Sequence, residues 1–207
     1  MNENVQIYIK DVNAQYQTGN AHEHAYRPAL KDLLSSLLKH YTVINEPTRV
    51  DCGAPDFMLM KGKIPMAFVE AKDLNDGDLD GVRANKEQFT RYKQSLNTII
   101  FTDYLDFHLY EDGAFVDSVR LAEVKGTKIV LLPENEDKFL QLIERLGNAK
   151  PQKITSSQKL AQLMAAKARL LRNAIATSIE KDTDEESALY GQMKAFQQVL
   201  IHDIDAT

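Results

Sequence analysis

Three charged residues lie at the ends of two neighbouring extended segments, where folding could bring them together. Asp56 starts one apolar run, and Glu70 and Lys72 end the next run along the chain. Because side chains alternate along a β-strand, Glu70 and Lys72 project to the same face. A hairpin that joins the two runs would place the Asp56 carboxylate beside Glu70. Two carboxylates with a small gap between them suit Mg²⁺, a hard cation that prefers oxygen ligands and keeps several of its waters.

This arrangement is typical of phosphate-ester hydrolysis. A divalent metal polarises a phosphoryl oxygen and lowers the pKa of a bound water, and a lysine at the same site can orient that water or stabilise the developing charge. The alternative for Glu70 and Lys72 is a solvent-facing ion pair on an edge strand. Asp56 at hairpin distance favours the metal site over that alternative.

The elements that must position these residues follow from the spacing of apolar side chains. A three- and four-residue spacing after Pro28 predicts a helix that begins there, because proline is tolerated in a first helical turn. Any turn that contains Glu23 is then kinked or separate. Residues 55–60 and 64–71 flank a glycine-containing turn and predict the hairpin. The remaining prediction is helices over 5–16, 82–96 and 133–146 and strands over 42–50, 98–102, 107–110, 114–120 and 128–132. This order predicts an α/β fold, a mixed β-sheet flanked by helices.

The central residues resemble the motif of the PD-(D/E)XK nucleases. Pro55-Asp56, the hairpin and Glu70-Ala71-Lys72 match its two parts. The resemblance implies a restriction-endonuclease-like core that acts on double-stranded DNA. It implies that Asp56 and Glu70 bind Mg²⁺, with Mn²⁺ as a substitute, and that Lys72 assists the attack of water on a phosphodiester.

Two further matches extend this resemblance. The family often supplies another acidic residue from a helix before the hairpin, and Glu23 fits as a third residue of the metal site. RecB-like and Mrr-like branches carry a glutamine and a tyrosine four residues apart after the lysine strand, as Gln88 and Tyr92 are, and residues four apart share one helix face. The alternatives are a helix-start carboxylate for Glu23 and a polar pair that closes a helix against the sheet for Gln88 and Tyr92.

Three short segments widen the similarity to roughly residues 20–120. They are similar to the amino-terminal nuclease portion of type IIG or single-polypeptide type I restriction-modification enzymes, which also contain an adenine-specific DNA methyltransferase: Glu23 to Leu30, Asn45-Glu46-Pro47 and Thr102 to Leu105. This implies a nuclease domain over residues 1–150 and a helical connector over 151–207, built from amphipathic helices at 157–179 and 185–204. It also implies a methyltransferase and specificity region in the same full-length polypeptide. With one site per chain, cleavage of both strands suggests that two chains meet on DNA.

Composition alone gives no argument for DNA binding. The 207 residues carry a formal net charge of -5, and nucleic-acid-binding domains are usually basic. Several basic residues nevertheless fall near the hairpin, so a local positive groove is expected: Arg27, Arg49, Lys61, Lys63, Lys72, Lys86, Arg91 and Lys93. The single cysteine, Cys52, and the absence of a long apolar run favour a cytoplasmic protein.

Two other function classes stay open. Residues 76–87, from Asp76 to Glu87, satisfy the EF-hand calcium-loop pattern. Against a calcium-binding module stand the strand predicted before the loop and Arg83 at a position that is usually apolar. The second alternative is a catalytically inactive DNA-binding or regulatory domain that keeps the nuclease scaffold.

Overall fold

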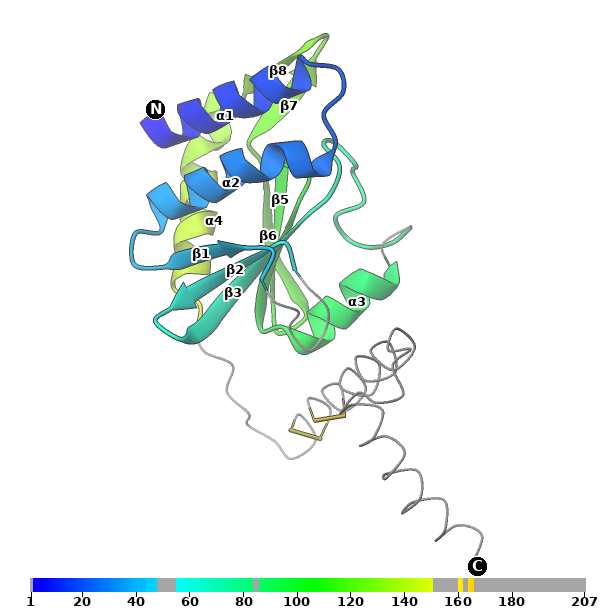
Figure 1. Cartoon of the computed structure of the whole chain (residues 1–207). Coiled ribbons are helices and arrows are strands. Elements are labelled where there is room, and N and C mark those ends of the chain that lie inside the picture. Colours follow the sequence, from blue (N-terminus) through cyan, green and yellow to red (C-terminus); the bar gives the residue numbers. More distant parts are fainter. Residues whose placement is uncertain (1, 48–54, 84–85, 151–159, 162–163, 166–207) are drawn as a thin grey trace, which may run out of the picture. The chain divides into compact units, whose positions relative to one another are not determined.

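The computed structural model describes residues 2–47, 55–83, 86–150, 160–161 and 164–165. Its elements, labelled in Figure 1, are helices α1 (Glu3–Tyr16), α2 (Glu23–Leu37), α3 (Lys86–Ser95) and α4 (Glu136–Gly147), a 3₁₀ turn η1 (Pro133–Asn135), and strands β1 (Thr42–Asn45), β2 (Phe57–Lys61), β3 (Ile64–Ala71), β4 (Thr98–Thr102), β5 (Asp106–Glu111), β6 (Ala114–Arg120), β7 (Ala122–Lys125) and β8 (Lys128–Leu131). None of the helices within these residues is long and apolar enough to cross a membrane.

One mixed sheet organises the described residues. Its six strands follow the order β1-β2-β3-β4-β5-β6, and the β3–β4 pair is parallel while the other neighbours are antiparallel. The two parallel strands occupy the middle, where every residue of β4 is buried. A parallel pair covered on both faces is expected to be nearly continuously apolar, as these strands are. The predicted fold class, a mixed sheet flanked by helices, is therefore confirmed.

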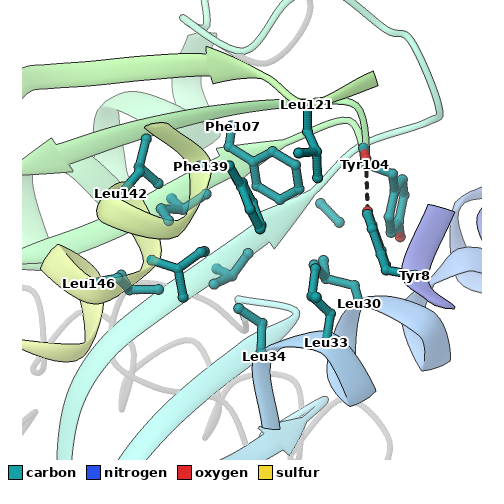
Figure 2. Close-up of a cluster of buried hydrophobic side chains, with 14 of the residues drawn as sticks. Tyr8, Leu30, Leu33, Leu34, Tyr104, Phe107, Leu121, Phe139, Leu142 and Leu146 are labelled. Atoms are coloured by element: carbon teal, nitrogen blue, oxygen red, sulfur yellow. Dashed lines mark hydrogen bonds between the residues drawn. The ribbon is translucent and has the colours of Figure 1, made fainter. Parts of the chain in front are cut away.

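Helices cover the two faces of the sheet unequally. Helices α1, α2 and α4 lie on one face, and α3 lies on the other (Figure 1). Alternate β3 residues separate these two cores: Ala67 and Val69 belong to the larger one and Phe68 to the smaller one. Figure 2 shows the larger core, where the rings of Phe107 and Phe139 lie 4.8 Å apart. In the smaller core Phe89 of α3 stacks on Phe101 of β4.

The start of α2 differs from the prediction. The helix begins at Glu23 and contains Pro28, so the predicted start at Pro28 is wrong and the turn around Glu23 is not separate. Pro28 is exposed and close to the helix start, and the one interior bond that it removes would involve the carbonyl of His24, which is also exposed. The first turn is held in addition by a main-chain bond from Ala25 to His22 and by the Tyr104 phenol on the Glu23 carbonyl. Tertiary contacts thus outweigh the local preference of proline.

Two other differences concern the loop after β3 and the chain after β6. Val82 and Arg83 lie in a bend rather than in the predicted helix, because the Asp78 carboxylate accepts their main-chain N–H groups. Strand β7 was not predicted, and it pairs with β8 in a separate two-stranded sheet. The remaining described strands and helices agree with the predicted segments to within a few residues.

The predicted carboxy-terminal connector falls almost entirely outside the described residues. Residues 1–155 form one compact unit and 156–207 a second. The two amphipathic helices predicted at 157–179 and 185–204 stay a prediction, and so does the domain division at residue 150.

Candidate active site

The hairpin of β2 and β3 brings Asp56 to the end of β3. Phe57 pairs with Val69 in the antiparallel ladder, so Asp56, one residue earlier, lies level with Glu70. Its Oδ2 atom accepts a 2.8 Å hydrogen bond from the main-chain N–H of Ala71. The two acidic residues are buried, with exposed fractions of 8% for Asp56 and 3% for Glu70. The alternation of strand residues and the hairpin thus produce the pair of carboxylates expected from their spacing.

Lys72, Glu70 and Gln88 form a closed triangle of hydrogen bonds. The Lys72 Nζ atom donates to Glu70 Oε1 at 2.9 Å and to Gln88 Oε1 at 2.8 Å. The Gln88 amide donates in turn to Glu70 Oε1 at 2.7 Å. Tyr92, one turn further along α3, lies 3.4 Å from the same amide nitrogen through its hydroxyl. Gln88 therefore fixes the lysine and the glutamate relative to each other, and α3 reaches the site through the residues that the sequence singled out.

Glu23 joins the site through a basic residue. The buried guanidinium of Arg27, one turn after Glu23 on α2, pairs with Glu23 Oε1 and lies 2.5 Å from Asp56 Oδ1. Its other terminal nitrogen donates to Glu46 Oε1 at 2.9 Å. Within the described part of the chain, no three His, Cys, Asp or Glu side chains are grouped so that they could hold a metal ion. A direct metal contact by Glu23 stays a prediction.

The electrostatics of the two central carboxylates are unusual. Burial raises the pKa of Glu70 to about 7, with a further contribution from the Asp56 carboxylate, while Lys72 acts in the opposite direction. Burial also raises the pKa of Asp56, and the Ala71 N–H group and Arg27 oppose this shift. The hairpin and α3 therefore hold two carboxylates close together in a poorly hydrated place, where each makes ionisation of the other more difficult.

One oxygen of this pair has no hydrogen-bond partner among the described residues. Glu70 Oε2 is buried and accepts no hydrogen bond from any residue that the structure describes. A buried carboxylate oxygen without a donor is costly unless a cation compensates it. The donor set fits a hard divalent cation, since Mg²⁺ takes carboxylate oxygens and completes its octahedron with water. Asp56 and Glu70 are the residues that would hold it.

Two residues contribute to the site through contacts that the sequence did not predict. Arg27 had a usable signal, because it lies four residues after Glu23 on one helix, the spacing of an ion pair. Tyr104 had no such signal, apart from its place in the segment Thr102 to Leu105 that is similar to restriction-modification enzymes. It adopts a positive φ of 70°, and its hydroxyl donates to the main-chain carbonyl of Glu23. Tyr104 thereby ties the end of β4 to the helix that carries Glu23 and Arg27.

The loop after Lys72 does not have the context of an EF-hand. Strand β3 precedes it, and residues 72–83 contain no helix. The Asp78 carboxylate accepts main-chain N–H groups of its own loop. Asp80 Oδ1 accepts from the Tyr110 hydroxyl at 2.8 Å and lies 2.9 Å from His108 Nδ1. Asp78 thus holds the loop internally and Asp80 fastens it to β5. The calcium-module alternative lacks the helix that it requires before the loop.

Comparison with known proteins supports the fold. No family model matches the chain, and no curated protein matches it in sequence. A cryo-EM structure of the DrdV–DNA complex contains a chain that is similar, with a TM-score of 0.52 and 21% identity over 68% of this chain and 95% of that chain. At this identity the likeness concerns the fold alone. The chain therefore shares the α/β fold of that chain, a mixed sheet flanked by helices.

Proposed function

We propose that this chain is a Mg²⁺-dependent endonuclease domain that hydrolyses phosphodiester bonds of double-stranded DNA, with Mn²⁺ as a substitute for Mg²⁺. The observation that carries the proposal is the buried Oε2 atom of Glu70 beside Asp56, which no described residue hydrogen-bonds, with Lys72 held nearby by Gln88. The similar fold of DrdV, whose structure is a complex with DNA, supports DNA as the partner.

Each residue of the site has a definite part in this chemistry. Asp56 and Glu70 hold the metal ion, which when bound polarises a phosphoryl oxygen and lowers the pKa of a coordinated water. Lys72 orients the attacking water and stabilises the negative charge that develops on the phosphate. Gln88 keeps Lys72 in place, and Tyr92 supports the Gln88 amide. Glu23 orients the site, in the present geometry by way of Arg27.

The wider context belongs to the same proposal. The segments around Glu23, Glu46 and Tyr104 support membership of a restriction-modification enzyme with a methyltransferase and specificity region in the same polypeptide. One site per chain cuts one strand at a time, so cleavage of both strands requires two chains to meet on DNA. The expected location is the cytoplasm.

Plasmid cleavage with charge-matched variants tests the activity. The wild-type chain is expected to cut DNA in Mg²⁺ or Mn²⁺ and to stop when EDTA is added. Asp56→Asn and Lys72→Met are each expected to reduce the rate at least about 100-fold, as loss of one preorganised charge typically does. Asp117→Asn and Lys138→Met form the control, because these residues make an exposed 3.0 Å ion pair between β6 and α4. Equal cleavage by wild type and Asp56→Asn would refute the assignment.

A second candidate function is a non-catalytic DNA-binding domain on the same scaffold. The pairing of Arg27 with Asp56, and of Lys72 with Glu70, favours it, since protein cations already engage both carboxylates. Calorimetric titration with Mn²⁺, together with a gel-shift assay in EDTA, separates the two candidates. DNA binding without Mn²⁺ binding or cleavage supports the scaffold, whereas Mn²⁺ binding that Asp56→Asn abolishes supports the nuclease site.

A further inference from the structure

The carboxylates around the hairpin outnumber the cations that they contact. The cluster contains four acidic and two basic side chains: Glu23, Glu46, Asp56, Glu70, Arg27 and Lys72. With all six ionised, it carries an excess of two negative charges, which is the charge of one divalent cation. Most of the cluster is poorly hydrated, since only the Glu46 side chain is largely exposed, at 63%. Its charge balance therefore matters for both folding and metal binding.

Arg27 is the central cation of this cluster. It reaches three acidic side chains from three different segments, namely the first turn of α2, the residue after β1 and the residue before β2. The segments that carry Glu46 and Asp56 are also joined directly, because the Glu46 main-chain N–H donates to the Asp56 main-chain carbonyl at 2.8 Å. The Arg27 side chain is 8% exposed, and its Nε atom has no hydrogen-bond partner among the described residues. Carboxylates therefore pair with the two terminal nitrogens of the guanidinium, while its Nε–H group has no acceptor among the described residues.

We infer that Arg27 is a resident counter-cation of the carboxylate cluster, which stabilises the metal-free protein by pairing with Asp56 and Glu23 and thereby weakens the binding of a divalent cation. This inference rests on the proposed metal site and assigns to Arg27 a role in setting its affinity. Asp56 is the shared element, because the same carboxylate contacts Arg27 and is a proposed metal ligand.

The direction of the effect follows from charge and from the second anchor of Asp56. A positive charge 2.5 Å from Asp56 Oδ1 repels an incoming cation and reduces the electron density that the carboxylate can offer it. Removal of Arg27 also leaves Asp56 in position, since its Oδ2 atom still accepts from the Ala71 N–H. Without the guanidinium, the gain in metal affinity from reduced repulsion is thus expected to exceed any loss from a less well-positioned Asp56 carboxylate.

Isothermal titration with MnCl₂ and MgCl₂ on the full chain tests the inference, with thermal melts in EDTA and in Mg²⁺ as a second measurement. Arg27→Met is expected to bind Mn²⁺ about tenfold more tightly than wild type, melt at a lower temperature in EDTA and gain more from Mg²⁺. Arg27→Met/Glu23→Gln restores the net charge of the cluster and is expected to return the affinity towards the wild-type value. Arg120→Met is the control for loss of an arginine, because Arg120 pairs with Asp106 on the far strands of the sheet.

Equal or weaker Mn²⁺ binding by a folded Arg27→Met would overturn the inference and leave the proposed nuclease intact. No metal binding by any variant would overturn both. Binding by Arg27→Met but not by wild type would support the inference while the cleavage assay decides the function. If Arg27→Met does not fold, the pair Glu23→Gln and Glu23→Gln/Arg27→Met replaces it. The double variant must then bind Mn²⁺ about tenfold more tightly than the single one, and equal binding contradicts the inference.

Discussion

The phenol of Tyr104 donates a 2.7 Å hydrogen bond to the main-chain carbonyl of Glu23. Tyr104 adopts a φ of 70°, which is strained for a residue with a side chain. Its backbone is fixed on both sides, since its carbonyl accepts from the Tyr8 hydroxyl (dashed line in Figure 2) and its N–H donates to Thr102 Oγ1. The strained residue thereby directs its phenol to the start of α2, the turn that carries Glu23 and Arg27.

Tyr104→Phe is expected to lower the free energy of unfolding by about 1–2 kcal/mol, because the Glu23 carbonyl loses its donor in a partly buried place. Urea titration measures this difference. Tyr26→Phe is the control, since the Tyr26 ring lies 5.1 Å from that of Tyr104 and its hydroxyl makes no hydrogen bond to another described residue. The control is expected to change stability by less than about 0.5 kcal/mol. Equal stability of the two variants would contradict the role given to the phenol.

The central site could be predicted because its geometry follows from short-range rules. Alternation along the chain places Glu70 and Lys72 on one face, and the β2–β3 hairpin, with a register shift between Leu59 and Met60, brings Asp56 level with Glu70. Gln88 of α3 hydrogen-bonds both Lys72 and Glu70. The alternation and the hairpin can be predicted from neighbouring residues, whereas the register shift between Leu59 and Met60 was not predicted.

The surroundings of the site could not be predicted in this way. Arg27 meets Glu46 and Asp56 only because α2, the end of β1 and the start of β2 converge in the folded chain. No local pattern couples residues this far apart. The same reason explains why the start of α2 was predicted wrongly. There the Tyr104 phenol donates to the Glu23 carbonyl from 81 residues away in the sequence. Long-range contacts here override the preference of proline for a first turn.

Gln88→Ala is expected to reduce Mg²⁺-dependent DNA cleavage about 10- to 100-fold, the usual effect of removing a residue that orients a metal ligand. Its amide holds Lys72 and Glu70 in one triangle, and without it the Lys72 Nζ atom loses one of its two hydrogen bonds to described side chains. Single-turnover cleavage of a plasmid measures the rate. Gln94→Ala, an exposed glutamine of the same helix, is expected to cleave at the wild-type rate. A Gln88→Ala rate within twofold of that control would exclude the orienting role.

Gly81→Ala is expected to destabilise the protein more than Gly77→Ala. Both glycines have positive φ values, of 69° and 72°, so both substitutions strain the backbone by about 1 kcal/mol. At Gly81 the added Cβ would also lie 2.6 Å from the Phe89 side chain, whereas at Gly77 it would meet nothing within 4 Å. We expect an additional loss of about 1–2 kcal/mol at Gly81, because overpacking forces a shift of Phe89. Urea unfolding of both variants gives the difference, and equal losses would show that the loop does not pack tightly on α3.

The raised pKa of Glu70 predicts a dependence of stability on pH with a definite sign. Its pKa is about 7 in the folded protein against an ordinary value of 4.5, so between these pH values the native state keeps a proton that the unfolded chain has lost. The free energy of unfolding therefore falls as the pH rises through this window and stays lower above it.

The Glu70→Gln variant tests this dependence because its side chain cannot ionise. In EDTA it is expected to be about 1–3 kcal/mol more stable than wild type at about pH 8 and no more stable at about pH 4.5. Urea titrations across this range measure the effect, with Glu87→Gln, an exposed residue of α3, as the control that keeps the wild-type profile. A Glu70→Gln protein that is less stable than wild type at about pH 8 would show that the buried carboxylate is compensated without a metal ion.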